Sequence, residues 1–316
     1  MLNHFDNKDF KLQNHHVEHF KQHGFVKLSK FLNDNAISFL QERAESEMQD
    51  SHFKDFVSRM RYERMRYELT QQQDKMYQLI SQPFFQETLL TITGMQELFF
   101  AFDMAIEIEK NKSSGFPWHV GIQTFAIQKL ENFGCTIWIP LNSIYVEKQA
   151  GGMAYVSQSI ICGKVIYEKI EPAIVSTLEK KEEKGVKTSL EDYYALRHGF
   201  LNSSAILDIL ETHKIEEDYE VGDVLLFNKN VIHRSSRLKD GPLAKRAAFI
   251  LRFMGVDSRF NKQQALNIDY PARKYGATLF AQTHKQMNLE DGQLFIESSY
   301  FDNIDKRMIK KIHNLN

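Results

Sequence analysis

The sequence predicts a β-rich α+β fold whose core is a β-sandwich or jelly-roll barrel. The middle of the chain holds a series of short segments in which large apolar residues alternate with small or polar ones, separated by turn signals. Helical spacing of apolar residues is concentrated in the first 95 residues and in one interruption of the strand series, so helices do not alternate regularly with strands. Because we find no linker and no internal repeat, one elaborated domain spanning 1–316 is preferred.

Composition narrows the possible functions. Forty basic and forty-one acidic residues give a formal charge of -1, so no global field favours nucleic acid or an anionic membrane. The two cysteines form no CxxC motif and no paired spacing, which fits a reducing compartment better than a disulfide framework. The N-terminus lacks an apolar signal region, and no run approaches the ~20 apolar residues of a spanning helix. We expect a cytoplasmic protein without nucleic-acid or membrane partners.

The first 95 residues are predicted to be mainly helical. Residues 14–23 place apolar side chains at helical spacing before Gly24, and GFVKLSKFL then alternates like a strand. A second helix follows Asn33 or Asp34, either of which can cap its first turn. The four histidines of the first helix and the basic, aromatic stretch RMRYERMRYE are interpreted as solvated faces, in preference to a metal site or an RNA-binding surface.

The barrel core is predicted at about residues 96–280. FFAFDMAIEIEK alternates so that Phe100, Phe102 and the next three large apolar residues would share one buried face. The other predicted strands are 134–141, 151–159, 222–233 and 246–256. A charged, helical segment at 165–218 interrupts them as a lid-like insertion able to cover the mouth of the barrel, and 281–316 form a C-terminal extension.

Two histidines are candidate metal ligands. His119 follows a loop, and His233 closes the predicted strand 222–233. In many non-haem iron enzymes two histidines and a carboxylate occupy one face of Fe(II), and on a strand the carboxylate two residues after the first histidine would point to the same side. Here that position is Gly121, which offers no ligand. Either this is not a metal site, or an exogenous ligand takes the place of the carboxylate.

Two arginines follow the second histidine. Arg246 lies thirteen residues after His233, and its planar fork can bind a carboxylate bidentately, as a 2-oxo-dicarboxylic cosubstrate would require. Arg252 shares a strand face with Arg246 if the strand is regular. A structural ion pair and a role near the site are equally good interpretations of Arg252.

The chain resembles the phytanoyl-CoA dioxygenase (PhyH) family of Fe(II)/2-oxoglutarate enzymes over roughly residues 16 to 280. The resemblance rests on the order and spacing of GFVKLSKFL, WHVG, GCTIWIPLNSIYVEKQAGGMAYVSQS and GDVLLFNKNVIHRSS…RAAFILRF. It implies a double-stranded β-helix, the cupin-like form of the jelly roll. It also implies that His119 and His233 bind iron and that Arg246 binds 2-oxoglutarate.

Gly121 departs from the hydroxylase pattern of that family but resembles its halogenating branch, which has Ala or Gly at this position. That branch also has a Trp-His pair like Trp118-His119 and a Thr-hydrophobic-Trp strand like Thr136-Ile137-Trp138, and its second-sphere Arg corresponds by spacing to Arg252. A Lys-Tyr-Gly-Ala segment after the barrel resembles 274–277. The resemblance implies that Thr136 and Trp138 lie at the cofactor site and that Gly121 and Arg252 accommodate the halide.

The expected function is therefore halogenation of an unactivated aliphatic carbon, with Fe(II), 2-oxoglutarate, O2 and chloride or bromide as cofactors. The substrate would be a small molecule or a carrier-protein-bound group, and the sequence fixes neither its identity nor the oligomeric state. One alternative is a hydroxylase or desaturase whose third ligand comes from elsewhere, with Asp103, Glu107 and Gln123 as candidates. Another is a non-catalytic jelly-roll binding protein.

Overall fold

Two antiparallel sheets form the centre of the protein, which was analysed as a computed structural model that describes residues 5–48, 64–69, 74–277, 287–301 and 303–311. The larger sheet has the order β1-β7-β4-β9-β3-β10, and β2 also pairs with β3. The smaller sheet has the order β6-β5-β8. The strands of the larger sheet are β1 (Phe25–Leu28), β2 (Arg64–Tyr67), β3 (Glu97–Glu109), β4 (Gly134–Pro140), β7 (Val224–Asn228), β9 (Lys245–Gly255) and β10 (Met308–Lys310). Those of the smaller sheet are β5 (Met153–Val156), β6 (Ile215–Glu216) and β8 (Ile232–Ser235).

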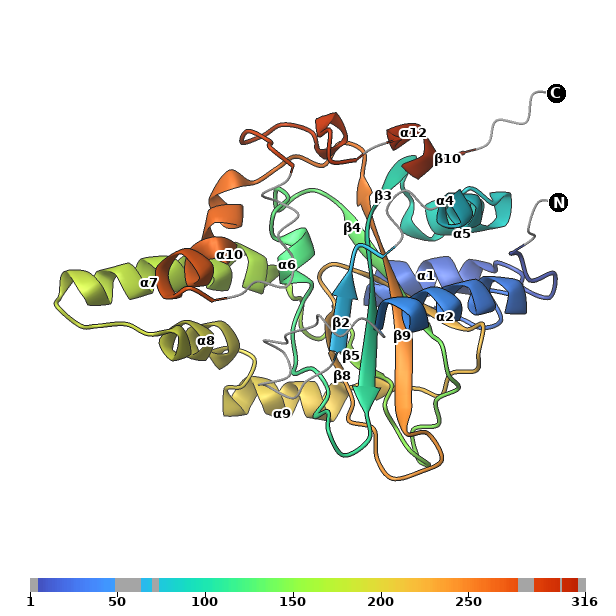
Figure 1. Cartoon of the computed structure of the whole chain (residues 1–316), viewed down its shortest axis with the longest axis horizontal. Coiled ribbons are helices and arrows are strands. Elements are labelled where there is room, and N and C mark those ends of the chain that lie inside the picture. The colour runs from blue at the N-terminus through green and yellow to red at the C-terminus, as the bar shows by residue number, and fades with distance from the viewer. Residues whose placement is uncertain (1–4, 49–63, 70–73, 278–286, 302, 312–316) are drawn as a thin grey trace.

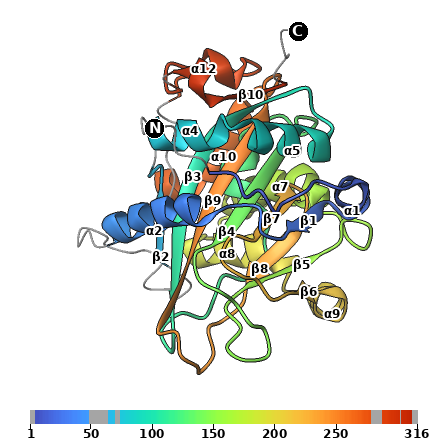
Figure 2. The same cartoon turned by 90° about the vertical axis from the view of Figure 1, so that its right-hand side faces the viewer.

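Helices cover the strands from two sides (Figure 1). The N-terminal helices pack on the outer face of the larger sheet, and Figure 2 shows α2 and α5 crossing in front of its strands. These helices are α1 (Asn14–His23), α2 (Asp34–Met48), α4 (Asp74–Ile80) and α5 (Pro83–Thr93). The other helices are α6 (Ile122–Phe125), η1 (Ile166–Ile170), α7 (Glu171–Glu183), α8 (Leu190–Gly199), α9 (Ser204–His213), α10 (Lys262–Tyr275), η2 (Phe295–Glu297) and α12 (Ile304–Arg307).

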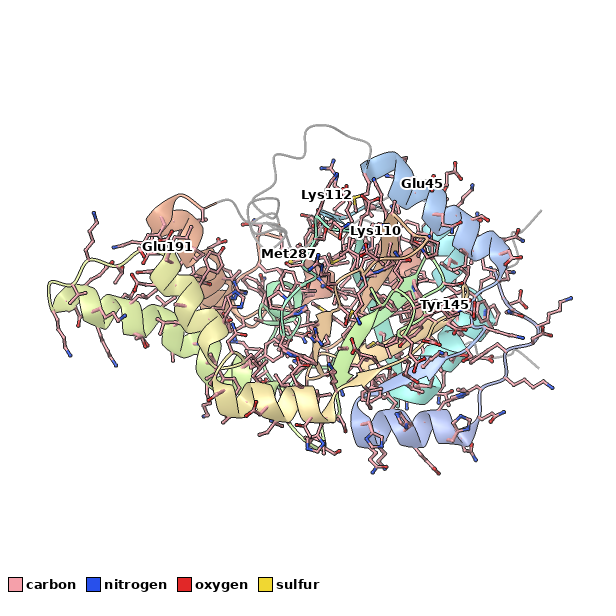
Figure 3. The ribbon with its side chains drawn as sticks, turned by 90° about the horizontal axis from the view of Figure 1, so that it is seen from below. Glu45, Lys110, Lys112, Tyr145, Glu191 and Met287 are labelled. Atoms are coloured by element: carbon pink, nitrogen blue, oxygen red, sulfur yellow. The ribbon has the colours of Figure 1, made fainter. Side chains whose placement is uncertain are left out.

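The insertion lies on the opposite side of the molecule from the N-terminal helices. In Figure 3, Glu191 on α8 and Glu45 on α2 mark these two sides, with the sheets between them. The predicted helical segment 165–218 is confirmed in outline, since η1, α7, α8 and α9 occupy 166–213 before the short strand β6. Among the described residues, no helix is both long and apolar enough to cross a membrane.

The interior of the barrel lies between the two sheets. Residues of β3, β4, β7 and β9 face residues of β5 there, and the shared cluster includes Met104, Trp138, Phe227, Ile250 and Tyr155. Alternate residues of the same strands, such as Ile137 and Leu251, face the N-terminal helices. This period of two is what the sequence pattern indicates, and the predicted jelly-roll core is confirmed.

Two details of the predicted strands are wrong. The register of β3 against β9 shifts between Phe100 and Phe102, so Phe100 joins the outer cluster while Met104 faces the interior. A bulge adds one residue, which moves the following side chains to the other face.

The second error concerns the predicted strand 222–233, which is two strands in different sheets. Between β7 and β8 the Asn228 side chain accepts a hydrogen bond of 2.9 Å from the Asn230 amide, and the Val231 amide donates to the Asn228 carbonyl at 3.2 Å. This local turn carries the chain from the larger to the smaller sheet. His233 is consequently the second residue of β8 rather than the end of a long strand.

Candidate active site

His119 and His233 face each other across a single antiparallel bridge. The amide of each residue donates to the carbonyl of the other, with N–O distances of 2.8 Å and 2.9 Å. Their ring centroids lie 4.2 Å apart, and the ring planes are inclined by 54°. Two residues separated by more than a hundred positions are thus held side by side by the backbone.

Both imidazoles use Nδ1 in a hydrogen bond and leave Nε2 available. His119 Nδ1 lies 2.8 Å from the Pro117 carbonyl and His233 Nδ1 lies 2.9 Å from the Val231 carbonyl, so each Nδ1 must carry the proton and donate it. Among the described residues, neither Nε2 atom has a hydrogen-bond partner. A fixed Nδ1–H and a free Nε2 lone pair form the arrangement that metal-binding histidines adopt.

Burial keeps these histidines neutral. It lowers the pKa of His233 to about 4. It also lowers the pKa of His119 well below its usual value, with the neighbouring His233 contributing in the same direction. The charge of Arg252 contributes to both shifts, which places its guanidinium near the pair. Two neutral imidazoles at physiological pH can both ligate a divalent metal.

The sequence interpretation placed Gly121 on one strand with His119, and this is wrong. Its carbonyl accepts hydrogen bonds from the Thr124 and Phe125 amides and so begins the short helix α6. A Cβ atom at position 121 would lie 2.8 Å from the Phe125 ring. The same ring would lie 2.7 Å from a Cβ at Gly134. Phe125 therefore packs between two glycines, which gives Gly121 a packing role of its own.

The proposed substitutes for the missing carboxylate point elsewhere. Asp103 is buried and accepts a 2.8 Å hydrogen bond from the Leu69 amide, on the side of β3 that faces the outer cluster. Glu107 lies 3.2 Å from Lys245, again away from the barrel interior. The Gln123 side chain is outside the described residues. Among the described residues, no third His, Cys, Asp or Glu forms a metal-binding group with the two histidines.

The strands β9 and β4 carry a buried cation, Arg246, and a buried N–H donor, Trp138, on the face that lines the barrel interior. Arg246 is fully buried, and its guanidinium lies 5.6 Å from the Trp138 ring centroid. The Trp138 indole nitrogen is buried and has no hydrogen-bond partner in the described part of the chain. Trp138 and Phe227 belong to the same interior cluster, and Phe227 lies 4.7 Å from the His233 ring.

Arg252 lies at the end of the barrel that carries His119 and His233. It lies opposite Thr136 in the β4–β9 register. Its guanidinium donates to the Thr124 hydroxyl and hydrogen-bonds with the Tyr67 hydroxyl, while its buried Nε has no partner among the described residues. The structure thus brings His119, His233 and Arg252 together, and Thr136 lies beside Arg252.

The insertion contributes residues that the sequence interpretation missed. The Trp118 indole donates to Glu211 of α9 at 2.9 Å, and the same carboxylate lies 3.4 Å from Arg234. Arg234 in turn lies 5.1 Å from the Trp118 ring centroid. Trp118 and Arg234 directly adjoin the two histidines in the chain, so Glu211 connects the insertion to both. No local pattern marks Glu211, because its partners come from distant segments.

Neither a family model nor a curated protein matches this sequence. Several solved structures match its fold. The non-heme alpha ketoglutarate dependent carbocyclase SnoK from nogalamycin biosynthesis matches with a TM-score of 0.59 and 12% identity, covering 90% of this chain and 93% of that chain. The epimerase SnoN, in complex with Fe3+, alpha ketoglutarate and nogalamycin RO, matches with a TM-score of 0.59 and 14% identity, covering 89% and 94%. EctD from S. alaskensis with bound Fe matches with a TM-score of 0.53 and 16% identity, covering 83% of each chain.

These likenesses establish the fold. The chain has the jelly-roll fold of non-haem iron, 2-oxoglutarate-dependent oxygenases over most of its length. Its own residues fit the cofactors of that class: two imidazole nitrogens are available for a metal, and buried N–H donors are available for an anion. Membership of the phytanoyl-CoA dioxygenase family stays a prediction, because no family model matches.

Proposed function

We propose that the protein is an Fe(II)/2-oxoglutarate-dependent oxidoreductase whose iron ligands are His119 and His233. The observation that carries the proposal is the pair of neutral imidazoles with hydrogen-bonded Nδ1 and unused Nε2 atoms, held together by the backbone at the end of a jelly roll. When bound, Fe(II) and 2-oxoglutarate would activate O2, which is the oxidant for attack on an unactivated C–H bond.

In this proposal the inner face of β9 and β4 binds the cosubstrate. Arg246 pairs with a carboxylate of 2-oxoglutarate, because a buried guanidinium can form two parallel hydrogen bonds with a carboxylate. The Trp138 indole N–H donates to the same anion, which gives this buried donor a partner. The surrounding apolar side chains, including Phe227 and Ile250, exclude water.

We further propose that the reaction is a halogenation by chloride or bromide of a small-molecule or carrier-bound substrate. Gly121 supplies no carboxylate, so a halide would bring the missing negative charge to the metal. Arg252 supports this assignment because its charge acts on both histidines. A fixed cation near the ligands stabilises an anion in a site from which water is excluded.

Phe125 favours a second candidate, an oxidation without halide. The contact between its ring and a Cβ at position 121 is enough to explain a glycine there. The similar structures include a carbocyclase and an epimerase, so this fold also carries oxidations other than halogenation. In that case the enzyme would be a hydroxylase or a related oxygenase, with a third ligand from outside the described residues.

The test is anaerobic addition of Fe(II) and 2-oxoglutarate to the purified protein, followed by chloride or bromide. We expect a metal-to-oxoglutarate absorption band that shifts with halide in the natural protein, and no band in His119→Ala or His233→Ala. A band indifferent to both halides, with substrate present, would support the second candidate. Absence of a band in the natural protein would support the non-catalytic barrel.

A test of the halide role of Gly121 needs a second substitution at Phe125. Gly121→Asp alone places a Cβ against Phe125, so we expect it to lower stability by about 1–3 kcal/mol. Gly121→Asp combined with Phe125→Leu relieves the contact, and the new carboxylate should abolish the halide response of the iron band. Phe125→Leu alone is the matched control and should keep that response. A folded double variant that still responds to halide would place the anion away from position 121.

A further inference from the structure

A cavity lies behind Phe125. It has a volume of about 200 Å³ and lies between α6, the insertion and α10. Its lining includes Phe125, Gln128, Tyr167, Lys229 and Gln264, together with the exposed Glu168 at the insertion. The cavity can hold several water-sized groups.

Lys229 brings an unpaired charge to this cavity. The residue is 6% exposed, and its Nζ donates to the Leu130 carbonyl at 3.0 Å. In the described part of the chain its ammonium forms no ion pair, and a buried charge without a counter-ion is costly. Burial lowers the pKa of Lys229 to about 8, with Lys164 acting in the same direction and Glu131 opposing it, so the ammonium stays mostly protonated at neutral pH.

The lining holds a second unsatisfied group. Gln128 is 2% exposed, and its Oε1 has no hydrogen-bond partner among the described residues. Lys229 therefore has donors to spare, and Gln128 has a free acceptor. An anion accompanied by water would satisfy both groups, because water can donate to the anion and to Gln128 at once.

The cavity lies directly behind the position of the missing carboxylate. Tyr167 donates to the Lys229 carbonyl at 2.9 Å, and its hydroxyl would lie 3.8 Å from a Cβ at Gly121. The Phe125 ring lines the cavity and also packs against Gly121. One aromatic ring thus separates Lys229 and its cavity from the residue two positions after His119.

We propose that this cavity is a binding site for a monovalent, weakly hydrated anion of the halide class, with Lys229 as its counter-charge. A single ammonium balances one negative charge, and the Glu168 carboxylate at the lining disfavours multivalent anions such as sulfate. The apolar part of the lining, which includes Phe125 and Ala126, favours anions that lose water easily. The role as a halide store beside the reaction site rests on the proposed halogenase function, whereas the anion site itself does not.

The experiment uses the iron-free protein, so that the metal site cannot contribute. Bromide is titrated at constant ionic strength against sodium sulfate while the unfolding midpoint is measured. We expect a rise that grows with the logarithm of the bromide concentration above the Kd and reaches about 2–4 °C near tenfold the Kd. We also expect a bromide peak in anomalous diffraction within hydrogen-bond distance of Lys229 Nζ. The rise should persist in the His119→Ala/His233→Ala variant.

Lys229→Met should abolish both the rise and the peak. Lys164→Met is the matched control, because it removes the same charge from an exposed neighbour that does not line the cavity, and it should leave both unchanged. If Lys229→Met does not fold, the natural protein provides the test: a bromide peak beside Lys229 Nζ supports the proposal, and its absence overturns it. A rise that is absent, retained in Lys229→Met or lost in Lys164→Met would overturn the proposal. None of these outcomes depends on the iron band that tests the proposed function.

Discussion

Arg246 shows how one residue can indicate a ligand. Its guanidinium is fully buried and lies 5.6 Å from the Trp138 ring centroid, a cation–π contact that contributes about 2 kcal/mol when desolvated. Beside it, the Trp138 indole N–H is buried without a partner among the described residues. A carboxylate placed between the two groups would accept a hydrogen bond from the Trp138 indole and lie beside the Arg246 charge, which is why we propose their shared face for the cosubstrate.

Arg246→Ala should weaken 2-oxoglutarate binding by roughly tenfold to a hundredfold, because a charge-assisted bidentate pair contributes on the order of 1.5–3 kcal/mol. Arg246→Lys should recover only part of the affinity, since an ammonium lacks the planar fork. The measurement is an anaerobic titration of the iron complex with 2-oxoglutarate, and Arg273→Ala on the exposed side of α10 is the control. Unchanged affinity in Arg246→Ala would move the carboxylate to Arg252.

At the scale of elements, α9 connects the insertion to the strands that carry the histidines. Glu211 accepts from Trp118 and pairs with Arg234, and Lys214 lies 2.8 Å from the same carboxylate. Because Trp118 and Arg234 adjoin His119 and His233, a shift of α9 would act on both ligands together. We interpret Glu211 as a positioning residue.

Glu211→Ala should change the emission of Trp118 and reduce Fe(II) affinity by roughly twofold to tenfold, since partly exposed ion pairs contribute about 0.2–1 kcal/mol and the lost indole bond adds a similar amount. Glu211→Gln should restore the emission, because an amide oxygen can accept from the indole. Asp208→Ala on the exposed side of α9 is the control. The measurements are fluorescence in a Trp138→Phe background and calorimetric metal titration. Equal effects of Glu211→Ala and Asp208→Ala would contradict the positioning role.

The strands could be predicted from the sequence because alternation is a local feature. The structure also brings the two candidate histidines side by side, while metal binding by them stays a prediction. The predicted strand at 97–109 and the helical insertion are present in the structure, although the bulge between Phe100 and Phe102 breaks the predicted alternation. Alternation cannot tell which sheet a strand joins, so the turn at Asn228 was missed. The packing of Phe125 against Gly121 and Gly134 was missed as well, because it depends on the direction of one side chain, which apolar periodicity does not indicate.

For the whole molecule, histidine burial links folding to pH. Burial lowers the pKa of His198 to about 4, as it does for His233, and it lowers that of His119 well below its usual value. The unfolded chain, with ordinary histidines near 6.5, then binds more protons than the folded chain between about pH 6.5 and 4. The contribution of these neutral histidines to the free energy of unfolding is complete above pH 6.5 and decreases as the pH falls from about 6.5 to 4.

We expect the free energy of unfolding of the iron-free protein to decrease as the pH falls from 6.5 to 4, with His233 contributing on the order of 3 kcal/mol. Urea unfolding at a series of pH values measures the slope. His233→Gln should make the slope shallower, while His213→Gln, at the exposed end of α9, should not. An identical slope in His233→Gln and the natural protein would show that this imidazole is not held neutral by the fold.

The bridge between His119 and His233 has a consequence for how the metal arrives. Two main-chain hydrogen bonds hold the two proposed ligands together without an ion, so the chelate would be assembled by folding and not by the metal. The ion can then exchange in the mature protein without local refolding. Two imidazoles without a carboxylate also discriminate weakly among first-row divalent ions, and ions later in the series bind nitrogen more strongly than Fe(II) does. The metal that occupies this site is therefore expected to follow the supply of free ions around the protein, and copper or zinc in excess would displace iron.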